Sequence, residues 1–320
     1  QGSIDLMEDD LVFITNGCPT DTSCYGSQTE APDLAKIHNG QGESWDMWHR
    51  IAAQDPSFGH PDTFCSHEKE SNWMSATIDL KDDVVMSYIK SICKRDPHAG
   101  KVTTGGIVTV KDSQDGWFLS WTINRQPQFK SQPKNDVLVW VYGLYTDVPG
   151  NYIKKPMKEC TGIEIAEEWM YHIGVPSDKI AEYAEKHMNT TTCYMPYINA
   201  FFMPRHVEDR PLVVPEGAVN FAFIGQFAET PRDTIFTTEY SIRTGMEAVY
   251  TLMKVDRGVP ETWGSVYDVR ELLKATYYAV DKKQLKELHL SPIEKLALKK
   301  VLKKVKGTDI EKLLHDEKLI

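Results

Sequence analysis

The sequence lacks several features that would assign its class at once. No apolar run approaches the roughly 18 residues that a membrane-spanning helix needs, and the polar start QGSIDLMEDD does not resemble a signal peptide. Positive charge is scarce, because 36 Lys and Arg stand against 46 Asp and Glu for a net charge of −10. This balance argues against general nucleic-acid binding. The apolar and charged fractions are those of an ordinary globular protein.

Disulfide and metal-binding patterns are missing as well. None of the six cysteines forms a C-x-x-C pair, and no histidine spacing completes a zinc pattern. The segment HEKES at His67 is close to the H-E-x-x-H motif, but Ser71 stands where the second ligand would be. Because a chain of 320 residues needs no disulfides for stability, we expect reduced thiols, a cytoplasmic protein and no metal site.

The glycine-rich fingerprint of dinucleotide-binding folds is also absent. That fingerprint, G-x-G-x-x-G, follows a strand and opens a helix. The nearest segment, Gly40-Gln41-Gly42, has no third glycine and follows no predicted strand. If the protein binds a dinucleotide, we expect the phosphate-binding part to lie upstream.

Short apolar runs bounded by turn residues predict strands. The run at residues 10–15 ends at Asn16-Gly17 and suits a buried strand of an α/β sheet. Three more strands are expected at residues 106–110, 117–124 and 137–145. The last is nearly all apolar, so we expect it to be buried on both faces. Residues 193–205 are broken by two prolines and are interpreted as irregular wall rather than central strand.

Apolar residues at helical spacing predict helices in four further segments. These segments are residues 44–53, 82–94, 162–174 and 177–188. Ser44 is the expected N-cap of the first helix, and Gly174 the expected C-cap of the third. One face of the second helix is expected to hold Val85, Ile89, Ile92 and Cys93.

A strand, a glycine and a helix follow one another between residues 219 and 253. The apolar run VNFAFIG predicts a strand that ends at Gly225, and a helix is expected from about Thr237, with Thr237 or Thr238 as its cap. Its apolar stripe is expected to contain Ile242, Met246, Val249, Tyr250 and Met253. A helix N-terminus beside a glycine favours an electron-rich or anionic ligand. The alternative is an ordinary packed strand and helix without a ligand.

Six longer segments carry a more specific signal than any short motif. They are WTINRQPQF, VYGLYTDVPGNYIKKPMKECTG, MPYINAFFMPR, NFAFIGQFAETPRDTIFTTEYSIRTG, DLVFITNG and TGGIVTVKDS. Together they resemble the oleate hydratases, a family also known as the myosin-cross-reactive antigens, over nearly the whole chain. The resemblance implies an FAD-dependent enzyme, usually a homodimer, that adds water to the cis double bond of an unsaturated fatty acid.

The resemblance also implies an α/β fold with a particular layout. Part of an FAD-binding Rossmann-like domain is expected together with a mixed α/β substrate domain and a C-terminal helical segment. Residues 1–30 would end the first part of the FAD-binding domain, and residues 31–215 would bind the fatty acid. Residues 216–258 would return to the FAD, and residues 259–320 would form a lid or a membrane contact.

No catalytic residue is assigned within this chain. In the family, the glycine-rich FAD motif and the catalytic carboxylate and tyrosine belong to an N-terminal part that this sequence does not contain. We therefore interpret the chain, which also lacks an initiator Met, as a processed chain or an excised fragment that is inactive by itself. The resemblance places the flavin against Asn16, Gly17, Gly225, Gln226, Phe227, Thr237 and Thr238.

The segment WTINRQPQF is expected to bind the fatty acid head group. A carboxylate in an apolar tunnel needs hydrogen-bond donors, because its desolvation is otherwise costly. Thr122 and Asn124 are two apart on the expected strand and therefore share a face. The resemblance assigns the carboxylate to them and to Gln128, where some relatives have His. A simpler interpretation of Arg125 is a surface ion pair. Four aromatic residues could line the acyl tunnel, but they have the simpler interpretation of ordinary core residues: Trp121, Tyr142, Phe201 and Phe202.

The end of the chain reverses the charge of the rest. From Asp281 onward there are 11 Lys and 7 acids, for +4, which leaves −14 for the preceding residues. Leu298, Val301, Leu302 and Val305 are expected on one helical face, with Lys299, Lys300, Lys303 and Lys304 on the other. Such a helix suits an anionic membrane surface. The alternative is a lid that packs on its own protein.

Two other functions compete with the hydratase. The first is a flavin-dependent fatty acid oxidoreductase or isomerase on a related scaffold, which turnover with an electron acceptor would reveal. The second is a non-catalytic lipid- or membrane-binding fragment, which would bind vesicles without flavin or product.

Overall fold

The computed structural model describes the chain except residues 1, 8, 38–41, 231–236 and 260–267. The chain forms two compact units, residues 1–257 and residues 258–320. All strands of the described residues lie in the first unit, where they alternate with helices. The expected mixed α/β class is therefore confirmed.

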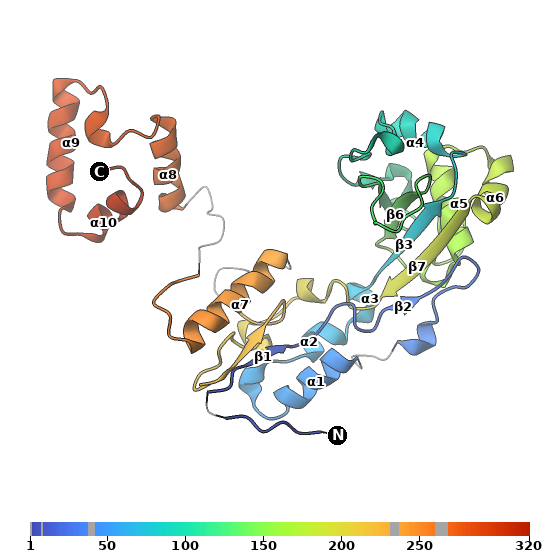
Figure 1. Ribbon diagram of the computed structural model, residues 1–320, viewed down its shortest axis with the longest axis horizontal. Coiled ribbons are helices and arrows are strands. Elements are labelled where there is room, and N and C mark those ends of the chain that lie inside the picture. The colour runs from blue at the N-terminus through green and yellow to red at the C-terminus, as the bar shows by residue number, and fades with distance from the viewer. Residues whose placement is uncertain (1, 8, 38–41, 231–236, 260–267) are drawn as a thin grey trace. The chain divides into compact units, whose positions relative to one another are not determined.

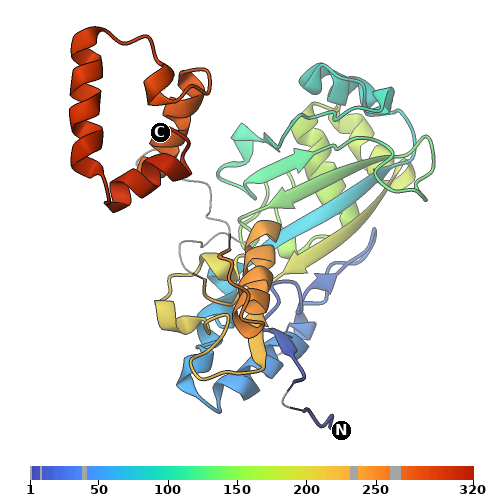
Figure 2. The ribbon, with the colours of Figure 1, turned by 60° about the vertical axis from the view of Figure 1, so that its left-hand side comes forward.

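A six-stranded antiparallel sheet forms one part of the first unit (Figures 1 and 2). In spatial order its strands are β2 (Cys24–Tyr25), β7 (Met188–Met195), β3 (Trp73–Leu80), β6 (Val137–Gly143), β5 (Leu119–Thr122) and β4 (Val108–Thr109). Strand β3 pairs with β7 on one side and with β6 on the other along nearly its whole length. It is therefore a central strand.

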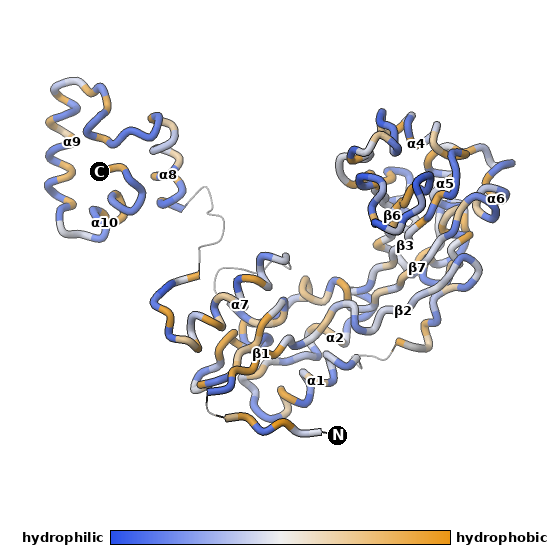
Figure 3. Tube along the Cα trace, viewed as in Figure 1, coloured by the Kyte–Doolittle hydropathy of each residue, from blue (hydrophilic) through white to orange (hydrophobic). Residues whose placement is uncertain are grey.

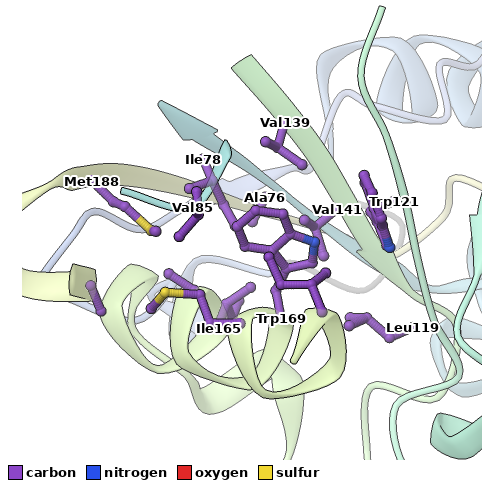
Figure 4. Packing of buried hydrophobic residues seen from close by; sticks show 14 of the residues in the cluster. Ala76, Ile78, Val85, Leu119, Trp121, Val139, Val141, Ile165, Trp169 and Met188 are labelled. Carbon is purple, nitrogen blue, oxygen red and sulfur yellow. The ribbon is translucent and has the colours of Figure 1, made fainter. Parts of the chain in front are cut away.

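Helices cover one face of this sheet. They are α4 (Met86–Cys93), α5 (Gly162–Ile173) and α6 (Ser177–Lys186). Trp169 of α5 is fully buried and lies over Ala76 and Val141 of the sheet, as Figure 4 shows. Val85, the N-cap of α4, and Ile89 within it are buried as expected, but Ile92 remains 41% exposed.

Helix α5 has well-defined ends and a buried carboxylate. Thr161 caps its N-terminus in a capping box with Glu164, and Gly174 ends it in the left-handed conformation, as predicted. Glu168 is 1% exposed. Its carboxylate accepts hydrogen bonds from the backbone N–H groups of residues 151–153 and contacts the His172 ring at 3.2 Å. One side chain therefore fixes a loop to the helix.

The opposite face of the sheet is half-exposed. Along β6, buried valines alternate with half-exposed Leu138, Trp140 and Tyr142. The prediction that this segment is buried on both faces is wrong, because the helices pack against the valine face. Trp73 of β3 stacks on Tyr142 with ring centroids 4.8 Å apart, and Trp140 lies at the same centroid distance from Tyr142. These three residues form an aromatic trio on the open face.

The two longest strands, β3 and β7, do not appear among the predicted elements. Polar residues occupy alternate positions in β3, for example Thr77, and four consecutive positions in β7, residues 189–192, so neither strand forms a continuous apolar run. The irregular wall expected at residues 193–205 is partly wrong, because its first three residues end β7. The rest forms turns and a short 3-10 helix, Ala200–Phe202.

The other part of the first unit is built on two parallel strands, β1 (Val12–Thr15) and β8 (Phe221–Ile224). Strand β1 is half-buried rather than buried, because its residues alternate between half-buried and exposed. Helix α7 (Thr238–Leu252) packs on β8. Three helices lie in the chain between β2 and β3: α1 (Glu43–Ala52), α2 (Asp62–Cys65) and α3 (Glu68–Ser71). Gly42, not Ser44, is the N-cap of α1.

An aromatic cluster holds α1 and α2 against the loop that follows β8. It consists of Trp45, Trp48, Phe64, Tyr197 and Phe227, all at most 1% exposed. The expected domain layout stays a prediction, and the structure shows how its segments pack. Residues 43–65 join the part expected to contact the flavin, and β2, expected in that part, joins the six-stranded sheet instead.

Helix α7 buries a different face from the one expected. Its buried residues are Tyr240, Arg243, Thr244 and Ala248. The apolar stripe is largely open, with Ile242 56%, Val249 41% and Met253 58% exposed. The prediction that the apolar stripe of α7 faces the core of this unit is therefore wrong. The opposite face, which carries hydroxyl groups, contacts the loop that follows β8.

The second unit is helical, with α8 (Val269–Ala279), α9 (Pro292–Val305) and α10 (Asp309–Asp316). Hydrophilic and hydrophobic residues intermingle along α9 and α10 in Figure 3. Ser291 caps α9 in a capping box with Glu294. Among the described residues of both units, no helix combines the length and the apolar character needed to cross a membrane.

Candidate functional site

The carboxyl ends of β1 and β8 meet at one edge of the parallel pair. Thr15 pairs with Ile224 at the last position of the register, so the segments after the two strands start side by side. These segments are residues 16–17 and residues 225–227. In open α/β sheets, ligands bind outside the carboxyl ends of strands. The fold therefore brings together five of the seven residues that the resemblance assigns to FAD.

Asn16 joins the two segments. Its side chain is 1% exposed, and Nδ2 donates a hydrogen bond to the backbone carbonyl of Phe227 at 3.0 Å. Its Oδ1 atom is also buried, yet it has no hydrogen-bond partner within the described part of the chain. Because an unsatisfied buried acceptor is costly, this oxygen is suited to a donor on a bound group.

Two glycines keep the backbone of this edge accessible. Gly17 has φ +67° and Gly225 has φ +99°, both in the left-handed region that disfavours a side chain. A Cβ on Gly17 would lie 2.8 Å from the Trp45 ring and 2.9 Å from the Phe227 ring. Only glycine therefore fits at position 17 without displacing the aromatic cluster.

Helix α7 begins at Thr238, and Thr237 is its N-cap. The Thr237 side chain accepts a hydrogen bond from the Tyr240 N–H at 3.2 Å, as the sequence predicted. Both threonines are exposed. The other N–H groups of a first turn carry partial positive charge and are available to an acceptor.

Two hydroxyl groups tie α7 to the segment after β8. The Gly225 N–H donates to Thr244 Oγ1 at 2.9 Å, and the Tyr240 hydroxyl donates to the carbonyl of Ala228 at 2.5 Å. Burial raises the pKa of Tyr240 to about 12, so its hydroxyl remains a donor at neutral pH. The helix and the glycine loop are therefore positioned as one assembly.

Gln226 and Phe227 offer mainly their backbone to this edge. The Phe227 ring is 1% exposed and packs against Trp45 and Phe64, so it does not line an open surface. The carbonyl of Gln226 accepts a hydrogen bond from Arg210 Nη1 at 3.1 Å. Arg210 is itself buried and pairs with Glu229 at 2.8 Å. This ion pair fixes the loop. No motif in the sequence predicts the pairing of Arg210 with Glu229.

A second candidate site lies on the open face of the six-stranded sheet. Asn124 and Gln128 line a cavity of about 330 Å³ whose other walls include Leu138, Trp140 and Phe129. Two amide side chains thus face a mostly apolar surface. This arrangement suits a ligand with a polar head and an apolar chain.

Thr122 lies beside this cavity but its hydroxyl is engaged. It is opposite Trp140 in the β5–β6 register, and its Oγ1 lies 2.8 Å from Thr104 Oγ1 and 3.2 Å from the carbonyl of Gly106. Strand β5 ends at Thr122, so Asn124 follows the strand rather than belonging to it. The two residues still lie on the side away from buried Trp121.

Two glutamines that the sequence did not single out hold the loop with Asn124 and Gln128. Gln126 is buried, and its Oε1 accepts from the Leu138 N–H at 3.2 Å and from Gln132 Nε2 at 2.8 Å. Gln132 Oε1 accepts from the Gln128 N–H at 2.8 Å. These bonds fasten the loop to β6 and so position the two candidate head-group residues.

Trp121, Phe201 and Phe202 do not share the environment of Tyr142. Trp121 is 1% exposed and packs in the core against Trp169, so it belongs to the helix-covered face. Phe201 packs on the aromatic cluster, whereas Phe202 is 63% exposed. Of the aromatics expected in an acyl tunnel, only Tyr142 lies on the open face of the sheet.

Comparisons with known proteins place the chain in a family. A model of the MCRA family matches residues 1–250. An oleate hydratase of Streptococcus pyogenes serotype M49 (strain NZ131) is 51% identical over 321 residues, which cover 99% of this chain and 53% of that protein. A linoleate hydratase of Lactiplantibacillus plantarum is 31% identical over 285 residues, covering 85% of this chain and 49% of that protein. The chain thus spans about half the length of these curated relatives.

Proposed function

The chain belongs to the MCRA family, and from this premise we propose that it is the C-terminal portion of an FAD-dependent hydratase. The proposed reaction adds water to a cis double bond of an unsaturated fatty acid and yields a hydroxy fatty acid. The names of both relatives support this substrate class. The structural observation that carries the proposal is the cavity in which Asn124 and Gln128 face an apolar surface.

The proposed flavin site is the edge formed by β1, β8 and α7. Asn16 and the backbones of Gly17 and residues 225–227 would hold the cofactor, with the helix start at Thr237 and Thr238 beside it. Three features fit such a group: the buried acceptor on Asn16, the two glycines with positive φ, and the helix N-terminus. Because hydration is not a net redox reaction, bound FAD would organise the site or tune its electrostatics.

The fatty acid is proposed to lie on the open face of the sheet. Asn124 and Gln128 would donate hydrogen bonds to its carboxylate, which lowers the cost of removing that charge from water. The aromatic trio and Leu138 would contact the acyl chain, because they are the half-exposed apolar side chains of the same face. Gln128 can donate a hydrogen bond but cannot become charged. Binding of the head group should therefore depend less on pH than it would with a histidine at this position.

Activity assays with mass spectrometry test the proposal. The full-length protein with FAD and oleate should give a product that has gained one water, whereas the 320-residue chain alone should not. Hydroxy fatty acid made by the isolated chain would contradict the second statement. Flavin reduction coupled to an electron acceptor, without a hydrated product, would favour the oxidoreductase instead.

A peripheral membrane contact is proposed for the second unit. The apolar face expected on α9 turns inward only in part: Leu298 and Leu302 line a cavity of about 270 Å³ within this unit, whereas Val301 is 55% exposed. A second stripe faces solvent instead, with Ile293 82% and Leu296 58% exposed. Helical spacing places Lys300 on that stripe. An exposed apolar stripe with interspersed lysine suits an anionic bilayer surface.

A homodimer is proposed as the functional state. The large exposed side chains of α7 support it, since Ile242 and Met253 are each more than half exposed in the single chain. Light scattering of the full-length protein should give twice the mass of one chain. A single-chain mass at micromolar concentration would refute the dimer without affecting the proposed reaction.

A further inference from the structure

Three metal-ligating side chains converge where α1 meets α2. His49 lies on α1, and Asp62 and Cys65 lie at the two ends of α2. His49 Nε2 is 3.5 Å from Cys65 Sγ and 3.6 Å from Asp62 Oδ1. One ligand atom from each of the three residues lies within 4.8 Å of the other two. The sequence did not predict this group, because its members come from two helices and match no zinc spacing.

The two distances from His49 match edges of a zinc coordination tetrahedron. Zinc lies about 2.3 Å from a thiolate sulfur, about 2.0–2.1 Å from an imidazole nitrogen and about 2.0–2.2 Å from a carboxylate oxygen. In a tetrahedron with such bonds, the nitrogen–sulfur edge is roughly 3.6 Å and the nitrogen–oxygen edge roughly 3.4 Å. The two histidine distances therefore agree with these edges within a few tenths of an ångström. Cys65 and Asp62, whose ligand atoms lie within 4.8 Å of each other, would move to the sulfur–oxygen edge of roughly 3.6 Å when an ion binds.

We propose that His49, Asp62 and Cys65 bind one Zn²⁺ ion, with water in the fourth position. On binding, a bond forms between the metal and the Cys65 sulfur while the thiol proton leaves to solvent. The mixed nitrogen, oxygen and sulfur set favours zinc over Ca²⁺ and Mg²⁺, which prefer oxygen ligands.

The exposure of the three ligands to solvent suits a metal site. The side chains of His49 and Asp62 are 35% and 82% exposed, so an ion can enter from solvent. Cys65 is 1% exposed, and in the metal-free chain its thiol donates a hydrogen bond to the carbonyl of Pro61 at 3.2 Å, which is given up when the thiol loses its proton as the metal binds. The ligands thus combine one buried anchor with two groups that solvent can reach.

The ion would fasten α1 to α2 behind the aromatic cluster. Trp48 directly precedes His49, and Phe64 directly precedes Cys65. Both rings pack on Phe227, with centroid distances of 5.6 Å and 5.2 Å. The same cluster fills the space against Gly17. Zinc at this position therefore acts as a structural clamp on the support of the glycine loops.

Cobalt spectroscopy and zinc competition test the site in the full chain. Metal-free protein is titrated with Co²⁺, and bound thiolate is detected by its near-ultraviolet charge-transfer band. Zinc affinity and stoichiometry are measured against a chromophoric chelator. We expect the band, one zinc per chain, and a higher melting temperature with zinc. Absence of the band in the unchanged chain would overturn the proposal.

Four variants assign the ligands. Cys65→Ser should remove the band, and Asp62→Asn should weaken zinc binding at least about tenfold. Because Asp62 is exposed, the second variant retains its fold and keeps the test valid if the first does not fold. His67→Gln and Cys93→Ser, which change a nearby imidazole and a distant thiol, should leave both readouts unchanged. A band that survives Cys65→Ser, or that His67→Gln removes, would refute the assignment.

Discussion

Asn124 and Arg125 are neighbours in the chain but line different cavities. Asn124 faces the cavity with Leu138 and Trp140, whereas Arg125 lines a larger, charged one of about 780 Å³. Asn124→Ala should therefore weaken fatty acid binding by about 1.5–3 kcal/mol, the value of a hydrogen bond to a charged group. Arg125→Ala is the matched control and should change binding little.

Calorimetric titration of the full-length protein with oleate measures both variants. Equal dissociation constants for Asn124→Ala and Arg125→Ala would contradict the assignment of the head group to the Asn124 cavity. A larger loss with Arg125→Ala would instead place the carboxylate in the charged cavity.

Glu168 gives the fold a dependence on pH with a defined sign. Burial by itself would raise the pKa of Glu168, but hydrogen bonds with His172 and the N–H groups of residues 151–153 outweigh burial and lower it. A lowered pKa stabilises the fold above the ordinary carboxyl pKa, and this contribution is lost as pH falls through the folded-state value. Glu168→Gln should therefore cost about 1–3 kcal/mol of unfolding free energy at neutral pH.

Urea unfolding at neutral and acidic pH checks this expectation. The difference between Glu168→Gln and the unchanged chain should shrink in acid, because both then carry a neutral side chain at position 168. Glu167 on the same helix is a control whose pKa is shifted in the opposite direction, since burial and the charge of Glu164 raise it. Glu167→Gln should leave stability at neutral pH unchanged or increase it.

At the scale of elements, the apolar residues of α9 fall into two groups that face different surroundings. Leu298 and Leu302 face their own unit, whereas Ile293 and Leu296 face solvent. Truncation after Leu290 should reduce binding to anionic vesicles, because each basic residue near such a surface contributes about 1 kcal/mol. Flavin binding should survive, because the proposed cofactor contacts all precede this helix. Vesicle co-sedimentation at rising salt measures the effect.

Salt separates the contributions of charge and apolar contact in that series. Surface charges are screened over roughly 8 Å at physiological ionic strength, so salt should weaken attachment without abolishing it. Leu296→Ser should lower the salt-resistant part, while Leu302→Ser should act through stability of the unit. Binding of the truncated protein that equals that of the intact one would identify α9 as a lid only.

Local signals predicted elements whose determinants are local. Helix α5 was predicted with its C-cap, because the apolar spacing and Gly174 lie in one short segment. The strand, glycine and helix around Gly225 were predicted for the same reason. Strand β7 was missed, because its polar run from Asn189 to Thr192 becomes a strand only through pairing with β3. The buried face of α7 was also missed, because it depends on hydroxyl contacts with Ala228 and Gly225 rather than on apolar spacing.

The head-group cavity and the proposed metal site were predictable to different degrees. Residues such as Asn124 and Gln128 entered through the family resemblance, and the structure adds that they face one cavity. Gln126 and Gln132, which hold their loop, give no signal in the sequence because their partners are mostly backbone groups. His49 and Cys65 meet only through the packing of two helices, so no linear spacing reveals them.

At the scale of the whole molecule, the half-exposed sheet face provides a built-in optical reporter. Trp73 and Trp140 are half-exposed on that face, whereas Trp45, Trp48, Trp117, Trp121 and Trp169 are buried. Indole emission shifts to shorter wavelength when water around the ring is replaced by hydrocarbon. An acyl chain that covers the aromatic trio should therefore shift the protein's fluorescence to the blue, and Trp140→Phe should diminish the shift. Octanoate and oleate titrations would then measure, without any label, how far along the sheet the chain of the fatty acid extends.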